Sequence, residues 1–221
     1  MLHLFCRLGA GWNGEAVVGA VSAAIDRGTQ VVSVAILGHK ADVGFMALDA
    51  DLWNLRLLQR DLAATGLEAV ASYVSLTEVS EYAAEVPEEL KRHRLYPQLP
   101  PPGKPAWCFY PMSKRRGEQQ NWFTLPFEER KELMGGHGSS GRNFSGRVLQ
   151  VVTGSTGIDD FEWGVTLFAA RPDDLKDVVY TLRYDRASAI YAEFGPFYAG
   201  MVTPLEDLVV LLAAPGGDGP P

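Results

Sequence analysis

The sequence predicts an α+β fold made of two copies of one β-α-β-β-α-β unit. Residues 31–66 have the pattern of strand, turn, strand and helix, and residues 147–185 repeat it with a Gly- and Asp-rich turn at the matching place. A strand and a helix precede each of these segments, and one more strand follows each. This order defines the ferredoxin-like unit, so we expect two antiparallel sheets that pack or close together.

The first copy begins with the strand "LHLFCRL" and the helix "GEAVVGAVSAAIDRG". Its second helix is indicated by the apolar spacing of Leu52, Leu55, Leu58 and Leu62, and the strand "EAVASYVSL" closes it. The second copy begins with "AWCFYPM" and "PFEERKELMGGHG". Leu175, Val178, Val179 and Leu182 mark its second helix, and "YAEFGPFYAGM" is its expected closing strand.

Four segments follow from this reading. Residues 1–86 form the N-terminal repeat, and residues 87–105 form a connector whose six prolines exclude a long helix. Residues 106–214 form the C-terminal repeat, and residues 215–221 form a flexible tail. Function is expected where the two copies differ, which is the C-terminal repeat.

Composition restricts the class of protein. The two cysteines lie far apart without CxxC spacing, which argues against a disulfide framework or a thiolate zinc site and fits a reducing compartment. The net charge of −7 disfavours nucleic acid as a partner. No apolar run is long enough to span a membrane, and no signal peptide is evident. We therefore expect a soluble, cytoplasmic protein.

One basic segment stands out in this acidic chain. From Lys91 to Arg116 there are seven Lys or Arg residues and no Asp or Glu. Such an asymmetry favours an anionic ligand, although acidic neighbours in space could also balance it on a solvated face.

His137 is the leading candidate for a metal ligand. It is expected at the end of an amphipathic helix, where Gly138 could terminate the helix and the helix dipole could stabilise a structural histidine. Against that alternative, Gly135, Gly136 and Gly138 remove side chains nearby, so a large flat ligand could approach the imidazole. One histidine without further ligands does not suit zinc, but it suits haem iron, whose porphyrin supplies four ligands.

Three polar residues on the predicted strands are further candidates. Tyr110 alternates onto one strand face with Cys108 and Met112, where it is either packing or a redox phenol. Lys114 continues the same alternation. Gln150 lies among apolar residues, so we expect a buried amide that is satisfied in the core or points into a cavity.

The C-terminal half resembles the coproheme decarboxylases, which are chlorite dismutase-like haem proteins of bacterial haem biosynthesis. The resemblance covers roughly residues 94–201 and rests on "RLYP", "CFYPMSKRR", "NW", "LPFEERKELM", "HG", "VLQVVTGSTG", "DDFEWGVTLF" and "YTLRYDRASAIYAEFGPFYAGM". It implies a dimeric α+β barrel made of two ferredoxin-like repeats, usually assembled as a homopentamer.

The resemblance also implies an enzyme, a peroxide-dependent oxidoreductase that converts two propionates of coproheme III to vinyl groups and yields haem b. Coproheme would be both substrate and redox cofactor, hydrogen peroxide the oxidant, and a ferrochelatase a possible transient partner. Chlorite dismutases carry an arginine where this chain has Gln150, so chlorite decomposition is not expected.

Site residues transfer only where the motifs match. His137 matches the axial ligand of the iron, Tyr110 the tyrosine that becomes a radical, and Lys114 a lysine that assists at a propionate. Gln150 matches the distal glutamine. The remaining positions implied to contact the substrate are Met112, Trp122, Arg94, Arg183 and Ser188. Whether His93 reaches the pocket stays open, and a haem peroxidase or a non-enzymatic haem carrier remain the alternatives.

Overall fold

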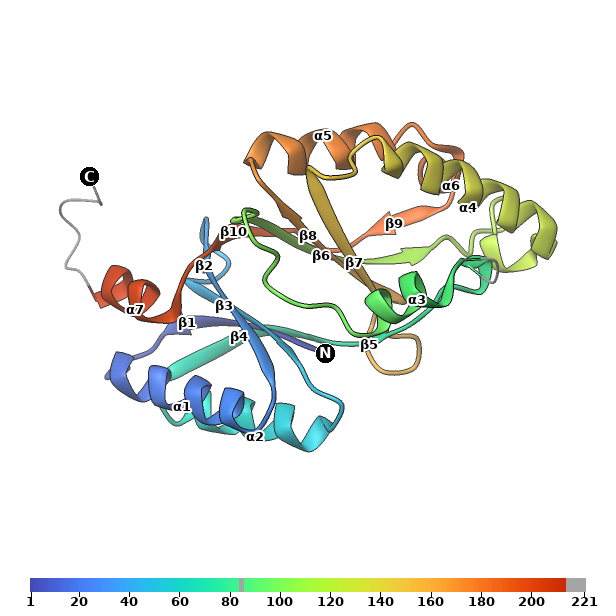
Figure 1. Ribbon diagram of the computed structural model, residues 1–221. Helices are drawn as coiled ribbons and strands as arrows, with labels where there is room; N and C mark the ends of the chain where they lie inside the picture. Colours follow the sequence, from blue (N-terminus) through green and yellow to red (C-terminus); the bar gives the residue numbers. More distant parts are fainter. Residues whose placement is uncertain (84–85, 214–221) are drawn as a thin grey trace. The chain divides into compact units, whose positions relative to one another are not determined.

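The computed structural model describes residues 1–83 and 86–213 and divides into two compact units. The first unit comprises Met1–Tyr73 together with the chain from Gly200 onward, and the second comprises Val74–Ala199. Each unit is an antiparallel sheet with helices, so the α+β class is confirmed (Figure 1). The predicted flexible tail, residues 215–221, lies outside the described residues.

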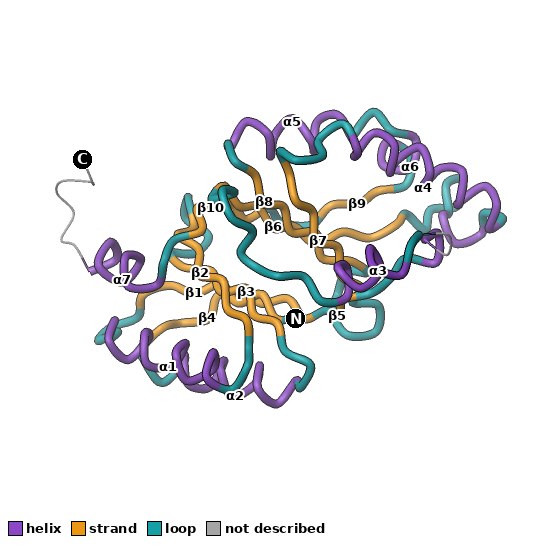
Figure 2. The backbone as a smooth tube through the Cα atoms, in the orientation of Figure 1, coloured by secondary structure: helices purple, strands orange, loops and turns teal. Residues whose placement is uncertain are grey.

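The first unit contains the predicted β-α-β-β-α-β order. Its elements in chain order are β1 (Leu2–Leu8), α1 (Gly14–Asp26), β2 (Gln30–Ile36), β3 (Val43–Leu48), α2 (Leu52–Ala63) and β4 (Leu67–Val74). The strand order is β4-β1-β3-β2, and β3 pairs antiparallel with both β1 and β2. In Figure 2 both helices run along the same side of these strands.

Side-chain caps fix where these helices begin. Asn13 accepts a hydrogen bond from the Ala16 amide at 2.9 Å, and Asp51 accepts one from the Trp53 amide at 2.9 Å. Three of the four leucines predicted for the buried face of α2 are buried, but Leu52 is 52% exposed. Leu52 is the first residue of α2, and the buried face of the helix begins one turn later, at Leu55.

The expected closing strand of the second repeat is wrong in detail. Residues 191–202 contain two strands, β9 (Ala192–Phe194) and β10 (Tyr198–Val202). Pro196 lacks an amide donor and interrupts the ladder, while Gly195 donates to the Pro111 carbonyl at 2.9 Å. The residues Gly200–Val202 then pair with β2 of the first unit, so the second unit ends before residue 214.

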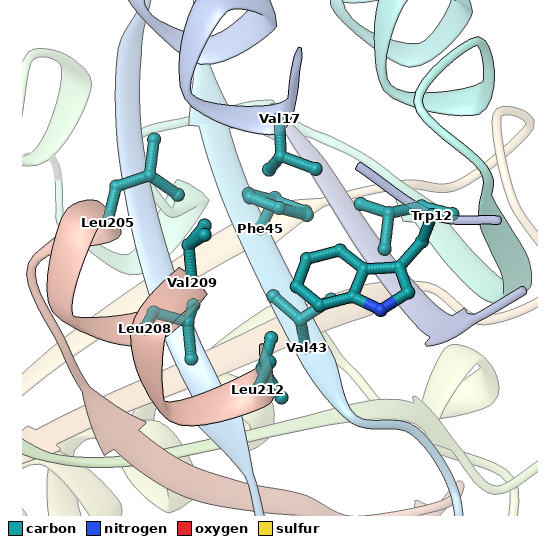
Figure 3. A pocket seen from close by; sticks show the side chains of 9 residues that line it. Trp12, Val17, Val43, Phe45, Leu205, Leu208, Val209 and Leu212 are labelled. Carbon is teal, nitrogen blue, oxygen red and sulfur yellow. The ribbon is translucent and has the colours of Figure 1, made fainter. Parts of the chain in front are cut away.

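The last helix, α7 (Leu205–Ala213), belongs to the first unit. Figure 3 shows its Leu205, Leu208, Val209 and Leu212 side chains around a small apolar pocket that Val17, Val43, Phe45 and Trp12 also line. Leu208 is 1% exposed. This helix completes the hydrophobic core of the unit.

The second unit repeats the same order. Its main elements are β6 (Ala106–Lys114), α4 (Phe127–Arg142), β7 (Val148–Gly154), β8 (Trp163–Ala169), α5 (Pro172–Leu182) and β9. The strand order is β6-β8-β7-β5, where β5 (Leu76–Thr77) pairs with β7 and β9 pairs with β6. Short helices are η1 (Glu81–Ala83), α3 (Glu88–Leu95), η2 (Trp122–Thr124) and α6 (Arg186–Ala189).

The two faces of this sheet differ. Side chains alternate along each strand, so residues paired across strands point to the same face. Trp107, Phe109 and Phe168 lie almost fully buried on one face. On the other face Tyr110 and Leu167 pack with Val178 of α5, and we call this the helix face. In Figure 1, α4 and α5 lie along one side of these strands.

The helix that carries His137 is longer than predicted. Instead of ending at His137 with Gly138 as the terminating residue, α4 continues through Arg142. Its four glycines do not break the helix, because glycine disfavours helix interiors by only about 1 kcal/mol each. His137 therefore lies inside a helix, and stabilisation of a terminal histidine by the helix dipole does not explain it.

Gly66 offers a test of the close packing in the first unit. Its φ is +85°, and a Cβ there would lie 2.7 Å from the Trp12 Cα atom. Gly28 has a φ of +98° with nothing within 4 Å of such a Cβ. Both Gly→Ala changes cost about 1 kcal/mol of left-handed strain. We expect Gly66→Ala to lower the free energy of unfolding in urea clearly further than Gly28→Ala; equal losses would contradict the backbone contact.

Candidate functional site

The centre of the site is a hydrogen bond between His137 and Asp185. The His137 Nδ1 atom lies 2.7 Å from the Asp185 Oδ2 atom, and the Asp185 side chain is only 7% exposed. A carboxylate can only accept, so Nδ1 carries the proton and Nε2 keeps its lone pair. Burial lowers the pKa of His137, an effect that Asp185 opposes and Lys114 reinforces. The imidazole is thus neutral and held in one orientation.

Sequence reasoning missed Asp185, although a local signal was available. Asp185 is the N-cap of α6, and its Oδ1 atom accepts from the Ala187 amide at 2.7 Å. An aspartate directly before "RASA" is typical of a helix start. What could not be read locally is that the second carboxylate oxygen faces His137, 48 residues earlier in the chain.

Lys114 brings a buried cation to the same place. Its side chain donates to the Ala187 carbonyl at 2.8 Å and lies 4.3 Å from the centre of the Trp122 ring. Burial lowers the pKa of Lys114 to about 8, while Asp185 and Glu162 act in the opposite direction. Ala187 is fully buried. Its carbonyl accepts from Lys114 and its amide donates to Asp185, so this residue of α6 connects the two charged side chains.

Glu162 contacts the end of β6 at Lys114 and Arg116. Its Oε2 atom accepts from the Lys114 amide at 2.8 Å, and its other oxygen is paired with Arg116. The Glu162 side chain is 7% exposed. A buried carboxylate with both oxygens engaged holds this strand end in place, because a buried charge without partners would be costly.

Tyr110 is buried on the helix face of β6. It stacks on Phe197 with ring centres 4.4 Å apart and meets Phe194 edge-on at 5.7 Å. Burial raises the pKa of Tyr110, and the Arg183 charge reduces this rise. The phenol therefore stays protonated at neutral pH. Arg183 itself is exposed and lies 4.8 Å above the Phe194 ring.

Gln150 is not the buried amide that the sequence predicted. It is exposed on β7, as is Val152, which is 41% exposed. Gln150 pairs with Leu167 and Val152 with Val165, and each of these pairs in turn with Cys108 or Tyr110. Both residues therefore lie on the helix face, where the helices leave this part of the sheet uncovered.

The remaining predicted residues are spread over the second unit. Met112 is half-buried beside the Tyr110 cluster, and Trp122 is 3% exposed in a cluster with Leu133 and Ala187. Ser188 lies half-buried in α6, one residue after Ala187. Arg94 and His93 are exposed in the last turn of α3. The structure joins His137, Lys114 and Trp122 into one set of contacts and leaves Arg94 and His93 outside it.

Space beside His137 is available on α4. A Cβ atom added at Gly135, Gly136 or Gly141 would meet no atom within 4 Å, and one at Gly138 would meet only Arg142, at 3.8 Å. These glycines are therefore not required by packing inside the chain. A neutral imidazole with a free Nε2 in such surroundings suits a bulky metal chelate that needs one protein ligand.

Two absences concern the described residues alone. Within residues 1–83 and 86–213, no group of three or more His, Cys, Asp or Glu side chains could hold a metal ion. Over the same ranges, no helix has both the length and the apolar character needed to cross a membrane.

Comparison with known proteins identifies the family. The sequence profile of the family described as chlorite dismutase matches residues 14–203. The chain belongs to the chlorite dismutase family. A chlorite dismutase from Candidatus Nitrospira defluvii has the same fold, with a TM-score of 0.77 at 20% identity over 96% of this chain and 94% of that chain.

More similar members of the chlorite dismutase family carry haem-related names. A coproheme decarboxylase of Staphylococcus saprophyticus is 43% identical over 80% of this chain and 75% of its own length. A candidate heme-binding protein of Natronomonas pharaonis is 45% identical over 81% of this chain and 32% of its own length. The chain thus spans about a third of that archaeal relative. A heme-binding protein from Thermus thermophilus superposes with a TM-score of 0.86 at 35% identity, over 96% of this chain and 94% of that chain.

The lowered pKa of Lys114 predicts a pH dependence of stability. The unfolded state binds this proton up to pH 10.5 and the folded state only up to about 8, so folding stability rises with pH between these values. We expect the free energy of unfolding of the wild type, relative to Lys114→Met, to increase from pH 8 to 10.5. Lys176→Met, at an exposed lysine, is the control and should show no such slope. A flat difference would contradict the buried cation.

Proposed function

We propose that this chain is a coproheme decarboxylase that uses hydrogen peroxide to convert two propionates of coproheme III to vinyl groups and so forms haem b. The observation that carries the proposal is that the second unit contains both a buried, protonated Tyr110 and a neutral, oriented His137. The staphylococcal relatives named coproheme decarboxylase, 43–44% identical to this chain, support it.

The reaction balances without a further reductant. Each propionate loses carbon dioxide, one proton and two electrons and leaves a vinyl group. One hydrogen peroxide takes up these two electrons, this proton and one further proton from the solvent, and yields two waters. Two peroxides are therefore consumed per haem b. When bound, the iron porphyrin supplies the redox chemistry, and the protein supplies position and charge.

Tyr110 is the group that acts on the propionate. Its raised pKa means that oxidation removes an electron and a proton together, so a neutral radical results. That radical abstracts a hydrogen atom from the β-carbon of the propionate and restores the phenol. The packing of Phe194 and Phe197 against the ring keeps water away from it.

His137 would hold the iron of the porphyrin through Nε2, and Asp185 keeps the imidazole oriented and basic. A Lys114 pKa of about 8 leaves the ammonium largely charged at neutral pH, so it can assist at a carboxylate. Gln150 cannot titrate, and its exposed amide would orient peroxide or substrate. Met112 and Trp122 contact the porphyrin, and Arg94, Arg183 and Ser188 hold its propionates.

The setting of the reaction is part of the same proposal. We place the chain in the cytoplasm as a homopentamer built from dimeric α+β barrels, with a possible transient contact to a ferrochelatase that delivers coproheme. A second candidate function is binding of finished haem, as a peroxidase or a carrier. It is favoured by the archaeal and Thermus relatives whose names describe them only as heme-binding.

Tyr110→Phe separates these functions. Wild type mixed with ferric coproporphyrin III and titrated with peroxide should lose the mass of formic acid twice, as followed by mass spectrometry. Tyr110→Phe should bind the porphyrin with little or no mass loss, because phenylalanine cannot form the radical. Tyr180→Phe, at an exposed tyrosine, should behave like wild type. Binding without mass loss in wild type would favour the carrier or the peroxidase.

Arg183 and Ser188 test the number of propionates that are held. Arg183→Ala and Ser188→Ala should each weaken coproheme binding more than haem b binding, because haem b has two propionates fewer. The loss expected for one hydrogen bond to a charged group is about 1.5 kcal/mol, or roughly tenfold in Kd. Arg171→Ala, at an exposed arginine outside the site, is the control for titrations followed by the porphyrin absorption band. Equal weakening for both porphyrins would count against a four-propionate substrate.

A further inference from the structure

Glu78 is a carboxylate on the helix face that the proposed reaction does not use. It follows β5, whose Leu76 and Thr77 pair with Gly154 and Thr153 of β7. Continuing that register places Glu78 opposite Val152, on the face shared with Tyr110 and Gln150. Glu78 is exposed, so its charge faces the uncovered part of this surface.

The Glu78 carboxylate makes one hydrogen bond and lies in the space that the missing side chain of Gly154 leaves open. Its Oε1 atom accepts a hydrogen bond from the Trp163 indole nitrogen at 3.1 Å. Trp163 pairs with Gly154, and a Cβ atom at Gly154 would lie 2.5 Å from the Glu78 Cδ atom. The carboxylate therefore occupies the space above Gly154 that any other residue would fill with its own side chain.

Distance along the strand decides what Glu78 can reach. Gly154 is four residues from Gln150, about 13 Å along β7 at roughly 3.3 Å per residue. A small oxidant held at Gln150 is too far away to contact it. Glu78 can instead meet the periphery of a flat ligand that spreads over this face from a centre near Gln150.

The helix face also carries opposite charges at its two edges. Arg183 lies over Phe194, which belongs to β9 at one edge of the sheet, whereas Glu78 lies beside β5 at the other edge. Four strand spacings of about 4.8 Å separate these edges, or roughly 19 Å. A ligand with carboxylates around its rim would experience attraction at the β9 edge and repulsion at the β5 edge.

We propose that Glu78 is a specificity-determining residue that directs the methyl-only edge of the porphyrin toward β5. The proposal rests on the proposed function, since it requires a propionate-bearing porphyrin on this face. Coproporphyrin III has one edge where two methyl groups are adjacent and one where two propionates are adjacent. Its isomer coproporphyrin I carries one methyl and one propionate at every edge, so every orientation brings a propionate near Glu78.

The two isomers make a direct test because their size, composition and charge are the same. Wild type should bind iron coproporphyrin III more tightly than iron coproporphyrin I, as measured by titration of the porphyrin absorption band. Glu78→Gln keeps an oxygen acceptor for Trp163 but removes the charge. We define the ratio as the Kd for isomer I divided by the Kd for isomer III. For unit charges about 7 Å apart in a water-like dielectric, Glu78→Gln should lower this ratio by about threefold.

A second variant leaves the net charge unchanged. Gly154→Ala displaces the flexible Glu78 carboxylate without removing it, so it should reduce the same Kd ratio by a smaller factor. In the double variant the two effects should not add, because both act on one carboxylate. Glu15→Gln, on α1 of the first unit, removes an equal charge and should leave the ratio at its wild-type value.

Each outcome has a distinct meaning. A wild-type ratio near one, or a ratio that Glu78→Gln does not change, would overturn the role of Glu78 while leaving the proposed function intact. A ratio that changes equally in Glu15→Gln would reduce the effect to net charge and also overturn it. If wild type bound neither porphyrin, the proposed function would fail first.

Discussion

The hydrogen bond between His137 and Asp185 is the constraint on which the rest of the site depends. Asp185 uses one carboxylate oxygen to start α6 and the other to orient His137 on α4. The loop after α5 and the middle of α4 are therefore fixed by one side chain. Without it, the imidazole would have no fixed tautomer and α6 would lose its cap.

Lys114 extends this constraint to the sheet. Its ammonium contacts the carbonyl of Ala187, which is also the residue whose amide bonds Asp185. A buried cation is costly by itself, and here Asp185, Glu162 and the Trp122 ring offset part of that cost. The part of the burial cost that they do not offset lowers the pKa of Lys114. Strand β6, helix α6 and helix α4 are thus connected through two charged side chains.

Much of the fold could be predicted from sequence because its signals are local. Apolar spacing located α2 and α5, and the repeated strand–turn–strand pattern located β7 and β8. Errors arose where a neighbour in space decided the outcome. Pro196 interrupts the strand, and Gly200–Val202 then pairs with β2, a partner that no local sequence pattern predicts.

The candidate site shows the same limit. His137, Tyr110 and Lys114 were visible as unusual residues on predictable elements. Asp185 was not, because its partner lies 48 residues away. Gln150 was expected to be buried, since a polar residue within an apolar strand usually is. Its exposure depends on how far the helices extend over β7, and α5 is a helix that contacts this strand.

The two repeats differ in how far their sheets are covered. Strand β2 of the first unit has no exposed residue, and α1 buries Val17, Val21 and Ala24. Its counterpart β7 exposes Gln150 and Val152, while α4 buries only Leu133. Four of the sixteen residues of α4 are glycines, which bring no side chain to the packing. Two copies of the same β-α-β-β-α-β unit therefore differ in this strand, which is covered in the first and partly open in the second.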